Sequence, residues 1–231
     1  MIDYMWLIIT VLAGGTAAFS FGKSPKWLPY LVSFSGAYLF AVIVFHLLPE
    51  IYSGETEHAH HHASVKITGA FLLAGLLFQM LLEYFSHGVA HAHSHKDAHP
   101  LTAGAVSGLF LHAFTEGLPV HQLNDHAYLY GILVHKFPIA VVLTSFLLQS
   151  GLSATRSFII LFLFALMTPA GTYAGEKIPF LTENHIYVSA FVTGILTHIG
   201  TVIIFESDTR HEIPLKKLIV MILAFILAYF N

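Results

Sequence analysis

Ionisable side chains interrupt two apolar stretches of the chain. His112 and Glu116 lie in the first stretch, and His135 and Lys136 lie in the second, next to Pro138. Such groups are costly at hydrocarbon depth, so they mark a functional site by default. His112 and Glu116 are four positions apart, which places both on one face of a helix, one turn apart. This spacing lets two side chains bind one cation.

The composition indicates that these stretches lie in a membrane. Hydrophobic residues make up 56% of the 231 residues, charged residues make up 10%, and the mean hydropathy is +0.73. These values are typical of an integral membrane protein. There is no cysteine, so soft-metal chemistry would have to rest on the 17 histidines. A net charge of -3 without a long basic block does not indicate a surface that binds nucleic acid.

Eight apolar stretches have about the 20 residues that cross a bilayer as a helix. They lie near residues 4–22, 28–49, 67–86, 101–120, 127–149, 157–175, 186–205 and 214–230. We therefore predict an all-α integral membrane fold, an eight-helix bundle forming a single domain over residues 1–231. The first stretch is preceded by Asp3 and by no Lys or Arg, so we expect it to be retained rather than removed as a signal peptide.

The basic residues predict the orientation of the bundle. Lys136 lies inside a span, and the other nine divide between the two sides. One side has Lys23, Lys26, Lys96, Arg156, Arg210, Lys216 and Lys217, and the other has Lys66 and Lys177. The positive-inside rule places the first group in the cytoplasm, so both termini face outward. The expected location is the plasma (inner) membrane.

Two connecting segments, residues 54–66 and 87–100, are rich in histidine. The first contains His58, His60, His61 and His62, and the second contains His87, His91, His93, His95 and His99. Neutral imidazole binds zinc, copper, iron and nickel, so these tracts are predicted to collect metal ions on the two faces of the membrane. The alternative is a polar connector without a binding role.

Prolines lie beside the buried ionisable groups. Pro138 removes a helical hydrogen bond to the Val134 carbonyl, and Pro119 acts in the same way on Thr115. We expect both helices to bend or open there, which is tolerated where the backbone lines a cavity.

The remaining ionisable groups in the spans favour structural roles. His198 is expected to form a hydrogen bond to a neighbouring helix, a contact that contributes about 1 kcal/mol. His46, Glu50, Glu83 and Glu206 lie near span ends and are expected at the interface with water.

Three sequence runs resemble the ZIP (Zrt/Irt-like) family of metal transporters. His112-Ala113-Phe114-Thr115-Glu116-Gly117 is similar to the His-Asn-x-x-(Asp/Glu)-Gly signature of that family's fourth helix, and His135-Lys136-Phe137-Pro138 is similar to its His-Glu-x-Pro motif. Phe45-His46-Leu47-Leu48-Pro49-Glu50 is typical of its second helix. The number of spans, the outward termini and the histidine-rich segment between the third and fourth spans also match.

The resemblance implies passage of divalent cations into the cytoplasm, usually Zn²⁺ and sometimes Fe²⁺, Mn²⁺ or Cd²⁺. It also implies inverted repeats, helices 1–3 and 6–8, around helices 4 and 5. The chain departs from the family where Ala113 replaces Asn, Lys136 replaces an acid and Ile139 replaces a later ligand. The second metal position of the family is therefore expected to be absent.

The expected metal ligands are His112, Glu116 and His135, and water or a carbonyl would complete the four-coordinate geometry of zinc. Lys136 and Pro138 are expected to modulate the site, and Lys136 would neutralise Glu116 when no metal is bound. One alternative is a metal-binding sensor or a relative that does not conduct. Another is an intramembrane zinc hydrolase, which the missing His-Glu-x-x-His motif disfavours.

Small residues indicate close contacts between helices. Gly14, Gly15, Gly69 and Gly75 lie in predicted spans. Residues of this size let two membrane helices approach closely, either within the bundle or across a homodimer interface.

Overall fold

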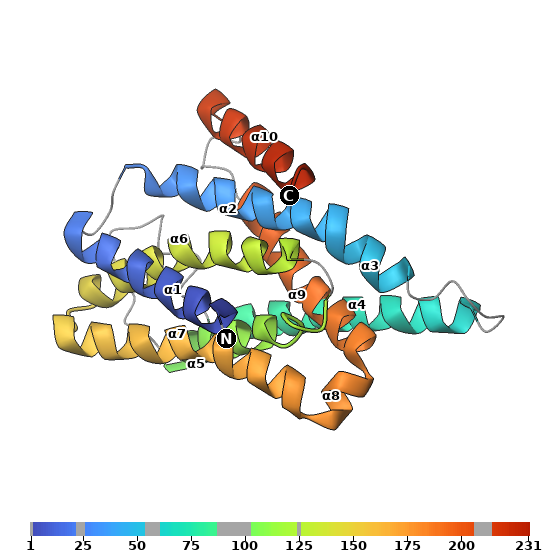
Figure 1. The fold of residues 1–231 in the computed structure, drawn as a ribbon. Helices are drawn as coiled ribbons and strands as arrows, with labels where there is room; N and C mark the ends of the chain where they lie inside the picture. The colour runs from blue at the N-terminus through green and yellow to red at the C-terminus, as the bar shows by residue number, and fades with distance from the viewer. Residues whose placement is uncertain (1, 22–25, 54–60, 87–102, 124–125, 206–213) are drawn as a thin grey trace.

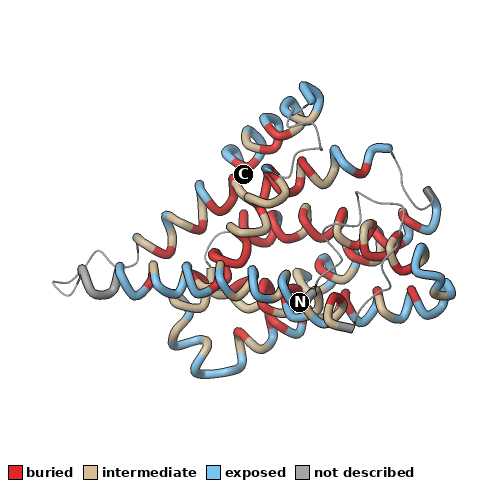
Figure 2. The backbone as a smooth tube through the Cα atoms, turned by 180° about the vertical axis from the view of Figure 1, so that it is seen from behind, coloured by how far each residue is buried: buried red, intermediate tan, exposed pale blue. Residues whose placement is uncertain are grey.

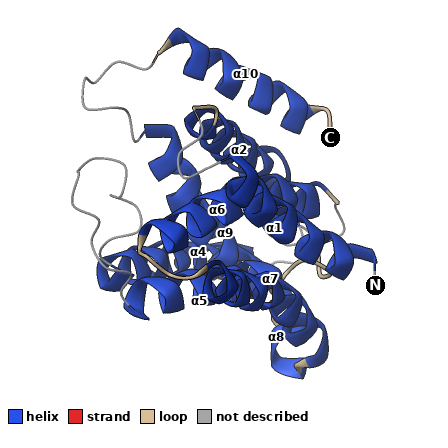
Figure 3. Ribbon diagram, turned by 90° about the vertical axis from the view of Figure 1, so that its left-hand side faces the viewer, coloured by secondary structure: helices blue, strands red, loops and turns tan. Residues whose placement is uncertain are grey.

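The computed structural model describes residues 2–21, 26–53, 61–86, 103–123, 126–205 and 214–231. Every regular element in these ranges is helical, and none is a strand (Figure 3). In chain order the elements are α1 (Ile2–Phe21), α2 (Leu28–Val42), the π-helical turn η1 (Ile43–Leu47), α3 (Leu48–Ser53), α4 (His61–Ser86), α5 (Ala103–Gly117), α6 (Ala127–Gln149), α7 (Ala154–Lys177), α8 (Pro179–Glu183), α9 (His185–Phe205) and α10 (Leu215–Tyr229).

Six helical segments of the described chain are long and apolar enough to cross a membrane. They are Ile2–Ser20, Leu28–Ser53, Val65–Phe85, Ala127–Gln149, Ala154–Lys177 and His185–Phe205. Many large apolar side chains on their outer surfaces are exposed, while small and apolar residues fill the interior (Figure 2). The prediction of an all-helical fold is therefore confirmed for the described residues, and six of its helices are candidates for spanning a membrane.

Two of the eight predicted spans are shorter than expected in the described residues. Helices α5 and α10 have 15 residues each. At 1.5 Å per residue, such a helix covers roughly 22 Å, which is less than the hydrocarbon core of about 30 Å. The α5 helix ends at Gly117, two residues before Pro119. The prediction that this span reaches residue 120 is wrong, because the helix gives way to a turn at Leu118, whose amide donates to the Thr115 carbonyl.

The boundaries of the histidine-rich segments also need correction. Helix α4 begins at His61, so residues 61–66 of the predicted loop 54–66 are helical, including His61 and His62. The apolar pattern of the following span continues back into this turn. Outside the described residues lie His58, His60, His87, His91, His93, His95, His99 and Glu206.

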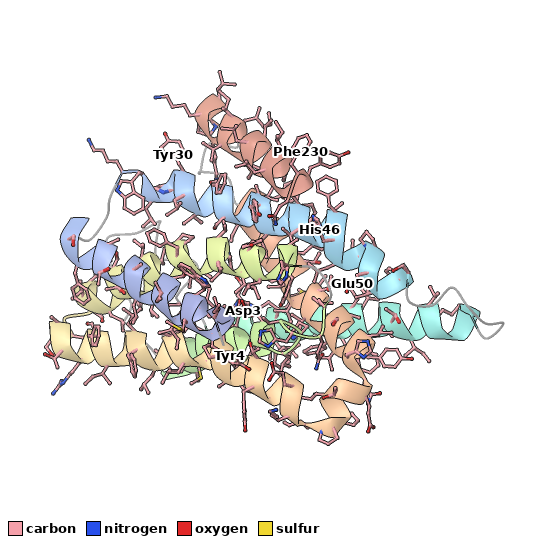
Figure 4. The ribbon with its side chains drawn as sticks, viewed as in Figure 1. Asp3, Tyr4, Tyr30, His46, Glu50 and Phe230 are labelled. Carbon is pink, nitrogen blue, oxygen red and sulfur yellow. The ribbon has the colours of Figure 1, made fainter. Side chains whose placement is uncertain are left out.

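The π-helical turn η1 divides the second span. The amide of Leu48 donates a hydrogen bond to the carbonyl of Ile43, five residues back. Pro49 follows directly, and its ring would clash with the Phe45 carbonyl in a regular α-helix. The wider turn accommodates the proline without ending the span. It also carries His46, whose Nε2 lies 3.1 Å from the Ala228 carbonyl oxygen of α10 (Figure 4).

Helices α4 and α9 pack side by side in parallel along most of their length. The ring of Phe71, in the first half of α4, stacks at 5.1 Å on that of Tyr187, in the first turn of α9. Towards the other end, Glu83 Oε2 lies 2.7 Å from His198 Nε2. This contact confirms the prediction that His198 is bonded to a neighbouring helix.

Three further pairs of helices pack closely: α1 with α6, α5 with α7, and α2 with α10 (Figure 1). The α5–α7 pair is parallel, since Phe110 contacts Phe164 near the middle of both helices and Leu118, directly after α5, contacts Gly175 near the end of α7. The α2 and α9 helices are antiparallel because Gly36 packs on Ile203 and Gly200 packs on Phe40.

Most of the predicted small-residue contacts occur within the chain. A Cβ atom at Gly14 would lie 2.4 Å from the Phe137 carbonyl oxygen, and one at Gly75 would lie 1.8 Å from the Phe191 carbonyl oxygen. A Cβ atom at Gly15 would lie 2.0 Å from a methyl carbon of Leu161. Gly69 has more space, with the Tyr52 hydroxyl oxygen nearest at 3.6 Å. These glycines bring helices of one bundle together.

The contacts between helices place the basic side chains at opposite ends of the bundle. The start of α1 and the end of α7 meet through contacts with His121. The start of α4 lies beside the end of the second span, where Tyr52 approaches Gly69. Among the described residues, Lys66 and Lys177 belong to this end, whereas Lys26, Arg156, Lys216 and Lys217 begin helices at the other. This distribution agrees with the sequence-based division of charges.

Candidate metal centre

Helices α5 and α6 bring the four predicted residues together in the interior. His112, Glu116, His135 and Lys136 are all buried, with at most 4% of each residue exposed. His112 Nε2 lies 3.2 Å from Glu116 Oε2, as expected for positions one turn apart on α5. The His112 and His135 rings are nearly perpendicular, and their centroids are 6.4 Å apart. Two helices therefore supply two imidazoles and one carboxylate to one buried region.

Lys136 forms an ion pair with Glu116. Its Nζ atom contacts Glu116 Oε1 and also lies 4.8 Å from the centroid of the Phe164 ring on α7. The ammonium thus meets a carboxylate and the negative face of an aromatic ring, and both compensate for its loss of hydration. This contact is the one expected if Lys136 neutralises Glu116.

Two hydroxyl groups that the sequence analysis did not identify also contact this site. Thr168 Oγ1 on α7 lies 3.1 Å from Glu116 Oε1 and 2.8 Å from the Ala113 carbonyl oxygen. The Tyr128 hydroxyl on α6 donates a hydrogen bond of 2.6 Å to the Glu116 carbonyl. The only local signal for Thr168 is a hydroxyl next to a proline, Pro169, in an apolar span.

Several polar atoms of the site have no hydrogen-bond partner within the described part of the chain. They are Nδ1 of His112 and both ring nitrogens of His135, whereas Nε2 of His112 and Oε2 of Glu116 face each other at 3.2 Å. Buried polar groups are normally hydrogen-bonded, and leaving one unsatisfied costs about 1–3 kcal/mol. Three such nitrogens in one buried region are available to bind a further polar or cationic group.

The side chains do not surround a single point in the conformation described. Among the described residues, no group of three or more His, Asp or Glu side chains is arranged to hold a metal ion. Lys136 contacts Oε1 of Glu116, and the centroids of the two imidazole rings are 6.4 Å apart. The carboxylate oxygen that could serve a metal ion together with His112 is therefore Oε2.

The two prolines have different effects on the helices that precede or contain them. Helix α6 continues through Pro138 from Ala127 to Gln149, so the helix is not interrupted beside His135. A proline inside a helix still leaves a carbonyl four residues earlier without its amide partner, here that of Val134. At Pro119, by contrast, α5 has already ended in a turn, in which the Leu118 amide bonds to the Thr115 carbonyl.

The position of Glu116 depends on the close packing of α5 against α7. A Cβ atom at Gly117 would lie 2.2 Å from the Thr168 carbonyl oxygen, and one at Gly171 would lie 1.9 Å from the Phe114 carbonyl oxygen. The two backbones touch at these glycines. Their contact brings the Thr168 hydroxyl to Glu116.

Substituting Gly171→Ala is therefore expected to force α5 and α7 apart. Overpacking of this kind typically costs about 1–3 kcal/mol, and backbone atoms cannot move aside as a flexible side chain can. Thermal unfolding of the purified protein should show a lower melting temperature. Gly131→Ala on α6 is the matched control, because the nearest atom to its Cβ would be a Val42 side-chain carbon at 3.4 Å. Equal melting temperatures for the two variants would contradict this account.

A second polar cluster lies outside the predicted site, at the start of α1. His121, in the turn after α5, contacts Glu176 of α7 through Nδ1 and lies 3.0 Å from Asp3 Oδ2 through Nε2. The Tyr4 ring packs edge-on against the imidazole, with centroids 5.4 Å apart. Figure 4 shows Asp3 and Tyr4 in the first turn of α1, beside α7. No local sequence pattern indicates this cluster, because its members are far apart in the chain.

Comparison with known proteins identifies no relative. No protein-family model matches the chain, and no curated protein sequence matches it. The function must therefore be argued from the site itself.

Proposed function

We propose that the protein is a transmembrane transporter of divalent metal ions, most favourably Zn²⁺, with His112, Glu116 and His135 as the ligands of a single site. One observation carries the proposal: two imidazoles share a buried region with the Glu116 carboxylate, and three of their four ring nitrogens have no hydrogen-bond partner among the described residues. Imidazole nitrogen and carboxylate oxygen are standard zinc ligands. These groups lie in the interior of an otherwise apolar helix bundle, where a metal ion would need such ligands in order to bind.

The pairing of the helices supports a ZIP-like architecture. Helix α1 packs on α6 and α7 packs on α5, while α4 packs on α9 and α10 packs on α2. Exchanging the first three spans with the last three, and α5 with α6, converts the α1–α6 pair into the α7–α5 pair. The same exchange converts the α4–α9 pair into the α10–α2 pair. Inverted repeats around a central helix pair produce this pattern. The pattern agrees with the resemblance carried by the sequence runs around His112, His135 and His46.

The ion pair between Lys136 and Glu116 gives the site a means of releasing its ion. An incoming Zn²⁺ would share the Glu116 carboxylate with the ammonium at Oε1, which stays nearby as a like charge. The competition weakens binding. A transported ion must leave as readily as it enters, so a site with one carboxylate, two imidazoles and a competing cation suits conduction better than storage.

The proposed direction of transport is into the cytoplasm. The end of the bundle with more basic residues faces inward under the positive-inside rule, which places the start of α1 outside. The histidine-rich segments before and after α4 would then collect metal ions on opposite faces of the membrane. Fe²⁺, Mn²⁺ and Cd²⁺ are accepted by the same ligand types and are further candidates.

Zinc uptake into proteoliposomes tests this proposal. The purified protein should carry Zn²⁺ across the bilayer, and His112→Ala or His135→Ala should reduce the flux to that of empty vesicles. His185→Ala is the matched control, since His185 is an exposed histidine at the start of α9 and should keep the wild-type rate. Flux that survives both buried-site substitutions would overturn the proposal.

The Lys136–Glu116 ion pair also favours a second candidate, a metal-binding protein that does not conduct. If the pair held the site closed, zinc would bind but would not cross the membrane. Equilibrium dialysis would then show zinc binding that His112→Ala removes, while vesicles would show no uptake. Binding and uptake lost together identify the transporter.

A further inference from the structure

Both ring nitrogens of His121 face a carboxylate, so a proton or a metal ion must lie in at least one of these two contacts in addition to the proton of the neutral ring. Nδ1 contacts Glu176 and Nε2 lies 3.0 Å from Asp3 Oδ2. A neutral imidazole has one N–H group and one lone pair, whereas both carboxylates only accept hydrogen bonds. One of the two contacts would therefore oppose lone pairs, unless a proton or a metal ion occupies it.

The arrangement resembles that of a metal-binding histidine whose ring is oriented by a neighbouring carboxylate. A carboxylate that accepts one ring N–H fixes the tautomer and turns the other nitrogen towards a metal ion. Glu176 can play this part at Nδ1, and the Tyr4 ring holds the imidazole from the side. Nε2 of His121 and Oδ2 of Asp3 then face each other as one nitrogen and one oxygen ligand.

Ions in solution can reach this position. The side chains of His121, Asp3 and Glu176 are each 25–33% exposed, in contrast to the buried His112 and Glu116. Asp3 also lines a cavity of about 440 Å³ between the starts of α1 and α6, which His126 lines as well. His121 follows Glu116 by five residues, so the cluster lies at the end of α5 nearest the proposed transport site.

We propose that Asp3 and His121 form a second divalent-cation site, oriented by Glu176, which loads ions before they reach His112, Glu116 and His135. Binding at this site is independent of the proposed function, but its role in loading rests on it. Two protein ligands leave two positions of a zinc ion to water, because zinc prefers four-coordinate geometry. Such a site binds weakly and exchanges quickly, as a loading site should.

Thiol labelling tests binding without depending on flux. The chain has no cysteine, so Asp3→Cys introduces the only thiol. Zn²⁺ should slow maleimide labelling of this variant at least tenfold in the detergent-purified full chain, and should not do so when His121→Ala is added. Glu183→Cys is the control, because Glu183 lies on α8 and is exposed. Zinc that leaves the Asp3→Cys rate unchanged, or slows all three variants equally, would overturn the site and leave a proton as the bridging charge.

Transport kinetics test the loading role in the native ligand set. Asp3→Asn and His121→Ala should raise the KM for Zn²⁺ on the order of tenfold with little change in kcat, because only capture is weakened. Glu183→Gln removes the same charge and should leave KM unchanged. Unchanged KM in Asp3→Asn would refute loading. If the wild-type protein carried no zinc at all, the proposed function would fail, and equilibrium dialysis of zinc would still decide whether the second site exists, because Asp3→Asn should remove binding that His112→Ala/His135→Ala leaves.

Discussion

Replacing Glu116 with glutamine is expected to abolish zinc uptake and to destabilise the protein. Glutamine has nearly the same shape but carries no charge, so the site loses its only carboxylate ligand. Lys136 is left as a buried ammonium without its counter-ion, since Glu116 is the acidic group it contacts. Removing one partner of a buried ion pair typically costs about 3–5 kcal/mol. Uptake into proteoliposomes and thermal unfolding, followed by the fluorescence of Trp6 and Trp27, measure the two effects separately.

The double variant Glu116→Gln/Lys136→Met separates ligand loss from charge imbalance. It removes both charges and should recover most of the lost stability, because neutral side chains of similar volume often replace a buried ion pair without penalty. Uptake should remain absent. If the double variant transported zinc, Glu116 would not be a metal ligand. If it were as unstable as Glu116→Gln, the cost would lie in packing instead of charge.

Replacing Lys136 alone with methionine is expected to destabilise the metal-free protein and to strengthen zinc binding. The Glu116 carboxylate then lies buried, with only the Thr168 hydroxyl near the oxygen that Lys136 contacted. The cost should again be about 3–5 kcal/mol without metal. With zinc present the cation supplies the missing charge and no ammonium competes for it. We expect the KM for Zn²⁺ to fall on the order of tenfold, which corresponds to about 1.4 kcal/mol.

Zinc-dependent thermal unfolding distinguishes this effect from a purely structural one. The rise in melting temperature on adding Zn²⁺ should be larger for Lys136→Met than for the wild type, because a ligand stabilises in proportion to its affinity for the folded state. Lys136→Arg is the matched control, since it keeps the positive charge and should keep the wild-type zinc response. An unchanged zinc response and unchanged transport in Lys136→Met would eliminate the competing role of Lys136.

The local part of the candidate site could be predicted from the sequence. His112 and Glu116 meet because four residues make about one turn of a helix, and the structure places their nitrogen and oxygen atoms 3.2 Å apart. The predicted span 127–149 coincides with α6, which carries His135 and Lys136. Periodicity and composition suffice for such contacts because both partners lie on one element.

The sequence alone did not distinguish the two prolines, because the effect of a proline on a helix depends on the packing around it. Pro138 does not interrupt α6, since the helix has apolar contacts on both sides of the proline to hold it together, including buried Ile132 and Val141. Pro119 instead follows the end of α5. The same residue type thus continues one helix and follows the end of another, and the surrounding packing decides between them.

The sequence by itself determined that this chain is a helical membrane protein with ionisable groups inside two helices, because hydropathy and helical spacing are local properties. Only the tertiary structure decided which groups meet across helices. Thr168 reaches Glu116 because the backbones of α5 and α7 touch at Gly171. His121 joins Asp3, 118 positions away, because the start of α1 packs beside the end of α5. Such contacts depend on the register between helices, which is set by packing and not by any one segment.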